Sequence, residues 1–205
     1  MNRRSFIRNV GIAAGLCGLY SWRVEPYWLD IEHVPMPVKN LPKPLIGKTL
    51  MQISDIHVGN GFDRNFLIQS FKKAKNYKPD IVVYTGDFVT WHNESQLQEL
   101  EQVLKHCVKG ELATLGILGN HDYGKKWKEN EVAEAVSKVA ETSGINMLRN
   151  SRKNVEGLVF TGFEDFWSDQ FDFYLMKNYD KAVANIVLCH NPDACDQNIW
   201  NGYEG

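Results

Sequence analysis

Four short motifs in this chain carry side chains that can bind metal ions or move protons. They are Ser54-Asp55-Ile56-His57, Gly86-Asp87, Gly119-Asn120-His121-Asp122 and Cys189-His190-Asn191. Together they offer carboxylate, amide and imidazole groups, and no Cys-x-x-Cys zinc motif accompanies them. Nitrogen and oxygen ligands without thiolates suit Mn²⁺, Fe or Zn²⁺ better than Ca²⁺ or a structural zinc. The motifs therefore predict a site for divalent metal ions, and for two of them.

Each motif directly follows a short apolar segment. The segments are 48–53, 81–85, 113–118 and 184–188, all rich in leucine or β-branched residues. This composition is typical of strands buried on both faces. Parallel strands end at the same edge of a sheet, and open α/β folds build their sites there. The four motifs are therefore expected to meet at one sheet edge.

The intervals between these strands have helical periodicity. Apolar residues recur at helical spacing in 63–77, 95–108 and 131–142. Two more strands are expected at 145–148 and 158–161, and the second of them is expected to open a second sheet. Alternation of strands and helices implies an α/β fold with a mostly parallel sheet covered on both faces.

The spacing of the ligands suggests how they share the ions. Asp55 and His57 are two residues apart, so in an extended segment both project to the same side and can reach one ion. The glycine before Asp87 allows a sharp turn, and the two carboxylate oxygens of Asp87 can bridge two ions about 3.5–4 Å apart. Asn120 offers a carbonyl oxygen and His190 a ring nitrogen.

Such a pair of ions activates a water molecule and neutralises phosphoryl oxygens, so the predicted reaction is phosphoester hydrolysis. The leaving group still needs a proton. His121 stands beside the ligand Asn120 but points elsewhere, which suits a general acid. Asp122 is expected to orient His121 and keep it protonated.

A simpler interpretation exists for each motif alone. Asp55 could cap a turn, Gly119-Asn120 could form a plain turn, and His190 could be a satisfied histidine at a strand end. The occurrence of all four motifs in this order, each after a strand, favours the metal site.

Length and charge limit the partners. The chain of 205 residues is long enough for one globular domain with a sizeable core. Its 43% hydrophobic and 23% charged residues are ordinary for a soluble protein. The net charge of −2 and the absence of a Lys/Arg stripe speak against nucleic acid as a substrate or partner.

The first 23 residues differ in character from the rest. Arg3-Arg4-Ser5-Phe6-Ile7-Arg8 precedes an apolar run at 10–20. A basic head followed by about ten apolar residues fits a signal peptide better than a membrane span, which needs roughly 20. The paired arginines resemble a twin-arginine export signal. Residues 1–23 are therefore expected to export the protein or to stay attached as a membrane anchor, and a cytosolic protein with a fortuitously basic and apolar start is the alternative.

Two further segments follow this leader. Five prolines in 24–46 argue against helix and central strand, so this part is expected to be a linker. Residues 47–205 then form the domain that carries the site.

The motifs Asp55-x-His57, Gly86-Asp87, Gly119-Asn120-His121-Asp122 and His190 together resemble the calcineurin-like metallophosphoesterase family, from Lys48 to the C-terminus. The leader and the segment 189–193 resemble its bacterial twin-arginine-exported, membrane-associated phosphodiesterase branch, in which serine more often precedes the histidine. The resemblance implies a four-layer α/β/β/α sandwich. It also implies one metal on Asp55, His57 and Asp87, a second on Asp87, Asn120 and His190, and His121 as the catalytic acid.

The resemblance also implies a class of substrate and raises the question of catalytic activity. Some members of the wider family act on nucleotide-diphosphate lipids such as UDP-diacylglucosamine. The resemblance therefore implies a membrane-proximal phosphoester as substrate. The candidates for apolar contacts with it, unless they lie in the core, are Trp91, Phe163, Phe166 and Trp167.

The family also has a Gly-His-x-His signature after the His190 loop, and this sequence lacks it. The expected protein is a dinuclear phosphodiesterase or pyrophosphatase. The alternatives are a C-terminally truncated, catalytically impaired or inactive product that keeps partial metal binding, and a non-catalytic module that only binds metal or phosphate.

Overall fold

The computed structural model describes residues 2–59, 61, 63–201 and 203. The chain forms two units, Met1–Met36 and Pro37–Gly205. The first contains α1 (Arg3–Arg23), none of whose residues is buried, and a 3-10 turn at Glu25–Tyr27. In the described part of the chain, no helix combines the length and apolar character that crossing a membrane requires.

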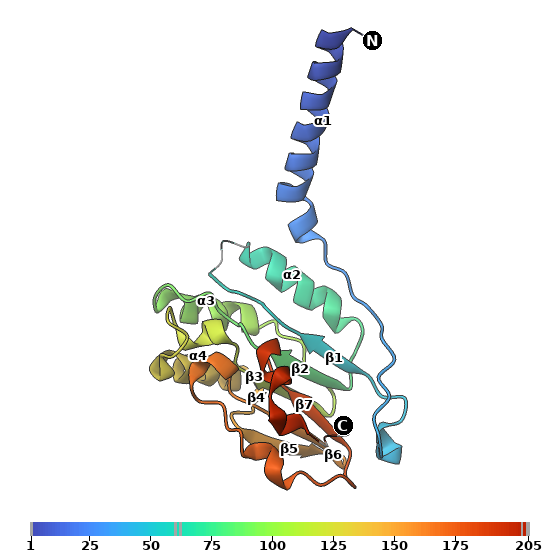
Figure 1. The fold of residues 1–205 in the computed structure, drawn as a ribbon, viewed down its shortest axis with the longest axis vertical. Coiled ribbons are helices and arrows are strands. Elements are labelled where there is room, and N and C mark those ends of the chain that lie inside the picture. The colour runs from blue at the N-terminus through green and yellow to red at the C-terminus, as the bar shows by residue number, and fades with distance from the viewer. Residues whose placement is uncertain (1, 60, 62, 202, 204–205) are drawn as a thin grey trace. The chain divides into compact units, whose positions relative to one another are not determined.

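The second unit is built on a parallel sheet. Its strands β1 (Leu50–Ile53), β2 (Ile81–Thr85), β3 (Ala113–Ile117) and β4 (Asn146–Met147) lie side by side in sequence order (Figure 1). The connecting helices are α2 (Arg64–Lys75), α3 (Ser95–Leu104) and α4 (Asn130–Thr142). Because crossovers between parallel strands are right-handed, this strand order places all three helices on one face of the sheet.

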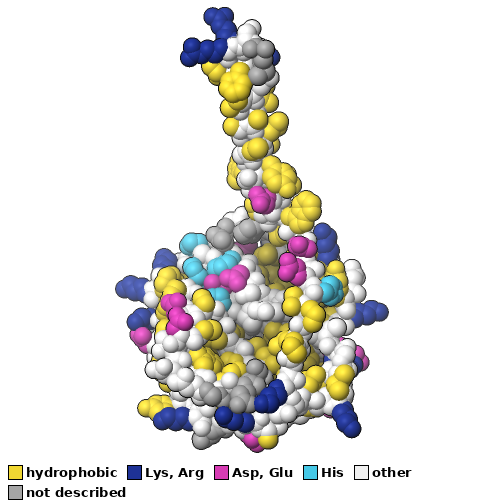
Figure 2. Space-filling model, turned by 45° about the vertical axis from the view of Figure 1, so that its right-hand side comes forward, with side chains coloured by type: hydrophobic (Ala, Val, Ile, Leu, Met, Phe, Trp, Pro, Cys, Tyr) yellow, Lys and Arg dark blue, Asp and Glu magenta, His cyan; other side chains and the backbone are white. Residues whose placement is uncertain are grey.

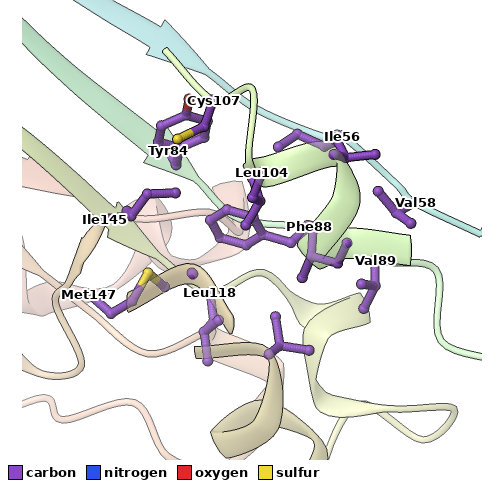
Figure 3. Close-up of a cluster of buried hydrophobic side chains, with 14 of the residues drawn as sticks. Ile56, Val58, Tyr84, Phe88, Val89, Leu104, Cys107, Leu118, Ile145 and Met147 are labelled. Atoms are coloured by element: carbon purple, nitrogen blue, oxygen red, sulfur yellow. The ribbon is translucent and has the colours of Figure 1, made fainter. Parts of the chain in front are cut away.

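The first core cluster lies between those helices and the sheet. Tyr84 of β2, Leu104 of α3 and Phe88 from the loop after β2 belong to it (Figure 3). Tyr84 and Phe88 stack with their ring centroids 5.9 Å apart. The loop that leaves β2 toward the predicted site is therefore anchored in the core.

A second sheet packs against the other face of the first. It consists of β5 (Ser151–Val155), β6 (Leu158–Gly162) and β7 (Asn185–Leu188), with β6 antiparallel to β5 and parallel to β7. Ile81 and Val83 of β2 share an inter-sheet cluster with Phe160 of β6. Since side chains alternate along a strand, β2 buries one set against the helices and the other against the second sheet.

A third cluster lies around Phe163, Phe171 and Ala194. Short 3-10 helices contribute to it, namely η4 (Phe166–Ser168), η5 (Leu175–Asn178), η6 (Pro192–Asp196) and η7 (Asn198–Trp200). The α/β fold class is thus confirmed, with the layer order helices, sheet, sheet. In the described residues, the part beyond the second sheet is made of 3-10 turns where α-helices were expected.

The boundary between the two units falls inside the segment expected to be a linker. Leu45 is buried in the inter-sheet cluster, with Val38 and Leu41 packed against it. The part of the Pro-rich segment from Pro37 onward therefore packs as part of the domain.

Candidate metal centre

The loops after β1 and β2 run side by side beyond the ends of their strands. The Asp55 N–H donates to the Gly86 carbonyl at 3.1 Å, and the His57 N–H donates to the Asp87 carbonyl at 2.9 Å. Val58 continues this pairing as an isolated bridge to Val89. Hydrogen bonding between the two strands thus extends into the loops and brings the first two motifs together.

Three of the predicted ligands form one cluster. His57 Nε2 lies 3.5 Å from Asp55 Oδ1 and 3.3 Å from Asp87 Oδ2. Ligand atoms of the three residues all lie within 4.8 Å of one another, close enough to hold one metal ion. Figure 2 shows histidine side chains gathered around acidic ones on one part of the domain surface.

His190 approaches the same carboxylate from the second sheet. Its Nε2 lies 3.4 Å from Asp87 Oδ2, the oxygen that also faces His57. Asp87 Oδ2 therefore lies between two imidazole rings that come from different sheets. This is the position that a carboxylate bridging two ions would occupy.

Hydrogen bonds on the far side of each ring set its orientation. His190 Nδ1 lies 2.7 Å from the Thr85 carbonyl, to which it donates, and His57 Nδ1 lies 2.9 Å from Thr90 Oγ1. Metal-binding histidines commonly donate their second N–H to such a partner, which leaves the lone pair on the nitrogen that faces the metal. The donor set of this cluster therefore fits a divalent cation.

The backbone is strained at the three clustered residues. Asp55, His57 and Asp87 have φ values of 56°, 47° and 54°, in the left-handed region. Each such residue costs about 1–3 kcal/mol, and strain of this kind concentrates at functional sites. The extended conformation expected for Asp55 and His57 is therefore wrong, although both side chains do reach one point.

Two glycines allow the loops after β2 and β3 to touch. A Cβ at Gly86, where φ is +95°, would lie 2.5 Å from Gly119 N, and a Cβ at Gly119 would lie 2.3 Å from Asp87 Oδ1. In this close contact the His121 N–H donates to Asp87 Oδ1 at 3.0 Å. One oxygen of Asp87 is thus fixed by backbone, and the other faces the two histidines.

The side chain of Asp122 accepts hydrogen bonds from the backbone, which differs from its predicted role. Its side chain is fully buried, its Oδ1 accepts from Val89 N–H at 3.1 Å and its Oδ2 accepts from Gly119 N–H at 2.9 Å. Burial and the charge of Asp87 raise the pKa of Asp122 to about 8. The expectation that Asp122 orients His121 is therefore wrong: its carboxylate joins the loops after β2 and β3.

His121 itself lies at the edge of the cluster. Its half-buried ring meets the His57 ring edge-on, with centroids 5.0 Å apart, and lies 5.8 Å from the Trp127 ring. Its role as catalytic acid stays a prediction. Asn120, buried, is the first residue of η3 (Asn120–Tyr123) and directly follows the glycine that touches Asp87.

Charge couples Asp87 to His190. Burial favours the neutral form of Asp87, but the hydrogen bond and charge of His190 hold its pKa below the usual range. Burial likewise opposes protonation of His190, and Asp87 outweighs it, raising the pKa of His190 to about 9. Asp87 and His190 therefore each stabilise the charged form of the other.

Two stacked tryptophans lie beside His121, and only Trp167 of the two was predicted as a candidate apolar contact. Trp127 and Trp167 stack with centroids 5.2 Å apart, and they are 37% and 40% exposed. Phe163, by contrast, is fully buried, so the alternative that placed it in the core is right. The sequence signal missed at Trp127 is a lone tryptophan among lysines at 125–128, where no core periodicity requires one.

Comparison with known proteins shows what the chain is similar to. The sequence profile described as calcineurin-like phosphoesterase matches residues 48–204. The chain is 28% identical to the UDP-2,3-diacylglucosamine pyrophosphatase LpxG of Chlamydia trachomatis, over 90% of this chain and 72% of that protein. It is 29% identical to an uncharacterized metallophosphoesterase of Aquifex aeolicus, over 87% of this chain and 68% of that protein.

A third relative is larger. The chain is 31% identical to a transmembrane protein with metallophosphoesterase domain of Danio rerio, over 88% of this chain and 42% of that protein. The profile match spans most of the sequence and includes all four motifs. The chain therefore belongs to the calcineurin-like phosphoesterase family, whose members are metal-dependent phosphoester hydrolases.

Proposed function

We propose that this chain is a dinuclear phosphodiesterase or pyrophosphatase that acts on a membrane-proximal phosphoester, for example a nucleotide-diphosphate lipid. The observation that carries the proposal is the position of Asp87 Oδ2 between His57 and His190. The relatives named UDP-2,3-diacylglucosamine pyrophosphatase support the class of substrate.

The residues divide into two ligand groups in this proposal. Asp55, His57 and Asp87 hold one ion, and Asp87, Asn120 and His190 hold the other, with Mn²⁺, Fe or Zn²⁺ as the candidate metals. Divalent cations so held supply Lewis acidity toward the phosphoryl oxygens and toward the attacking water. The His121 N–H keeps Asp87 Oδ1 engaged, so the other oxygen remains available between the rings.

The substrate proposal is tested by comparing lipid-linked and lipid-free diphosphates. With Mn²⁺ added, hydrolysis of UDP-diacylglucosamine in detergent is expected to be faster, in kcat/KM, than hydrolysis of UDP-N-acetylglucosamine. The exposed Trp127–Trp167 pair beside His121 offers an apolar surface for the non-reacting part of such a substrate. Equal rates on both substrates would contradict the lipid-linked proposal and leave phosphoester hydrolysis standing.

His121→Ala tests the proposed general acid. We expect kcat to fall by roughly 10²–10⁴-fold on a substrate with an alkoxide leaving group, which needs a proton in the transition state. The loss is expected to be much smaller on bis-p-nitrophenyl phosphate, because p-nitrophenolate is a weak base that leaves without protonation. The matched control is His92→Ala, which removes an exposed loop histidine. Equal losses on both substrates would contradict an acid role.

We also propose that residues 1–23 export the protein through a twin-arginine-like signal or attach it to a membrane surface. Helix α1 exposes its apolar side chains, among them Ile12 at 55% and Leu16 at 65%. Its first turn holds no acidic residue, whereas Arg3, Arg4 and Arg8 lie in its first two turns. Positive charge is unfavourable at a helix N-terminus, so an anionic lipid surface would stabilise this arrangement.

Vesicle binding checks the attachment part of this proposal. The double substitution Ile12→Glu and Leu16→Glu is expected to weaken binding to anionic phospholipid vesicles at least about tenfold, since burying each apolar side chain contributes about 1.5–3 kcal/mol. Val34→Glu with Met36→Glu is the control, because it adds the same charge at exposed apolar positions outside α1. Unchanged sedimentation of the α1 variant with vesicles would contradict attachment through this helix.

A further inference from the structure

The ring of His121 lacks the orienting partner that the sequence predicts for it. The carboxylate of Asp122 accepts instead from the main-chain N–H groups of Val89 and Gly119. His121 donates its own main-chain N–H to Asp87 Oδ1, and no described residue forms a hydrogen bond with its imidazole ring. A general acid needs a ring nitrogen within reach of the leaving group. Another contact must therefore orient this ring.

Two aromatic rings contact the imidazole of His121. The His57 ring meets it edge-on, with centroids 5.0 Å apart. The Trp127 ring lies 5.8 Å from it, with the two ring planes at 58°. Both distances lie in the range in which aromatic rings attract one another. Because His57 belongs to the predicted metal cluster, Trp127 is the neighbour whose presence still needs an explanation.

The backbone at Trp127 is unusual for a residue of this size. Its φ is 60°, in the left-handed region, where a bulky side chain is an outlier. The Trp127 N–H donates to the Gly124 carbonyl at 3.2 Å, and the Glu129 N–H donates to the Tyr123 carbonyl at 2.9 Å. Glycine or asparagine would adopt this φ at a lower cost in free energy. The tryptophan is therefore explained by its side chain and not by the turn, as strained residues at functional sites often are.

The loop after β6 holds Trp127 in place. The Trp127 ring stacks on that of Trp167, with centroids 5.2 Å apart and ring planes at 19°. Four residues before Trp127, the Tyr123 hydroxyl donates to the buried Glu164 carboxylate at 2.5 Å, and the other oxygen of Glu164 accepts from Arg149 Nε at 2.6 Å. The segment that carries Trp127 is thus joined to the loop after β6 by an exposed stack and by a hydrogen-bonded network.

We propose that Trp127 is a positioning residue for His121, whose indole ring restricts the imidazole to the orientation in which it can protonate the leaving group. The inference rests on the proposed function, because His121 is the general acid there. Trp127 then performs the orienting task that the sequence assigns to Asp122. A residue that acts in this way changes kcat, and only for substrates that need the proton. A tryptophan that merely contacts substrate would change KM instead.

The test compares two aryl phosphodiesters with different leaving groups. Diphenyl phosphate releases phenolate, whose conjugate acid has a pKa of about 10, like tyrosine, so its departure is assisted by a proton. Bis-p-nitrophenyl phosphate releases a weak base that departs without one. With Mn²⁺ added, Trp127→Ala is expected to lower kcat on diphenyl phosphate roughly 10–100-fold, the effect of a misplaced catalytic group. We expect kcat on bis-p-nitrophenyl phosphate, and KM on both substrates, to change less than about threefold.

A double variant separates positioning from other roles. Residues that act as a unit are non-additive, so Trp127→Ala is expected to change kcat on diphenyl phosphate less than about twofold in a His121→Ala background. Trp127→Phe keeps an aromatic ring beside the imidazole and is expected to restore most of the loss. Trp28→Ala is the matched control, because it removes an exposed tryptophan from the first unit, and it is expected to leave both rates unchanged.

Three results would overturn the role of Trp127. A raised KM with unchanged kcat on both substrates would show a residue that only contacts substrate. Equal losses with and without His121 would show that Trp127 does not act through it. Wild-type kinetics of Trp127→Ala would show that His121 needs no such contact. If the wild type hydrolyses neither substrate, or if His121→Ala lowers both rates equally, the acid role in the proposed function fails, and this is visible without any Trp127 variant.

Discussion

Asp87→Asn is expected to abolish hydrolysis of bis-p-nitrophenyl phosphate in the presence of Mn²⁺. The substitution removes the charge from the one oxygen that lies 3.3 Å from His57 Nε2 and 3.4 Å from His190 Nε2. A catalytic metal contributes several kcal/mol of transition-state stabilisation, and each 1.4 kcal/mol or so is tenfold in rate. Because both proposed ions depend on Asp87, we expect kcat/KM to fall at least about 1000-fold.

The fold should survive this substitution well enough for the rate to be interpreted. An asparagine at position 87 can still accept the hydrogen bond from His121 N–H through its amide oxygen. Asp180→Asn is the control, since Asp180 is exposed and its side chain accepts a local bond from the Ala182 N–H. Retention of more than a tenth of the wild-type rate by folded Asp87→Asn would contradict the proposed centre. Absence of any Mn²⁺-dependent hydrolysis by the wild type would favour the catalytically impaired alternative.

The strands and helices that position the site were largely predictable from the sequence. Strand β2 has the predicted bounds because its apolar residues fill both adjoining cores. The edge strand β5 was missed because three of its five residues are exposed, so Ser151–Val155 lacks the apolar pattern of a core strand. Local sequence therefore indicates the buried strands, β6 and β7 of the second sheet among them, and misses the exposed edge strand.

The detailed geometry of the predicted ligands could not be inferred in the same way. Positive φ values such as those of Asp55, His57 and Asp87 are uncommon for any residue that carries a Cβ. They persist here because Ile56, Val58 and Phe88, the residues between and beside them, are buried in the core. Tertiary packing thus overrides the local preference that supported an extended segment.

Residue type alone could not assign the two fully buried acids either. Asp122 lies in the most specific motif of the chain, yet it serves the backbone. Asp165 lies in no motif, yet one of its oxygens is buried without a partner in the described residues. The surroundings of each carboxylate, which residue type does not indicate, depend on the tertiary packing around it.

Gly119→Ala is expected to impair the site without changing any ligand. The backbone at Gly119, with φ of −105° and ψ of 177°, is open to alanine, so the effect is steric rather than conformational. The new Cβ would lie 2.3 Å from Asp87 Oδ1 and 2.6 Å from Asp87 N. Neither atom can yield easily, because Oδ1 is held by His121 N–H and the backbone of Asp87 continues from the fully buried strand β2.

The loop after β2 must therefore shift, and Asp87 moves relative to both histidines. A displacement of about 1 Å lowers rates by about 100-fold, and overpacking of this kind costs about 1–3 kcal/mol in the free energy of unfolding. Urea unfolding and kcat/KM measure the two effects. Gly116→Ala is the matched control on β3, since its Cβ would lie 2.7 Å from the sulfur of Met147 and 2.9 Å from Cγ2 of Ile145, neither of which is a predicted site residue. We expect this control to lose stability but to retain activity. If folded Gly119→Ala hydrolyses substrate as fast as Gly116→Ala, the position of Asp87 does not limit catalysis, and the close packing of the two glycines serves the fold alone.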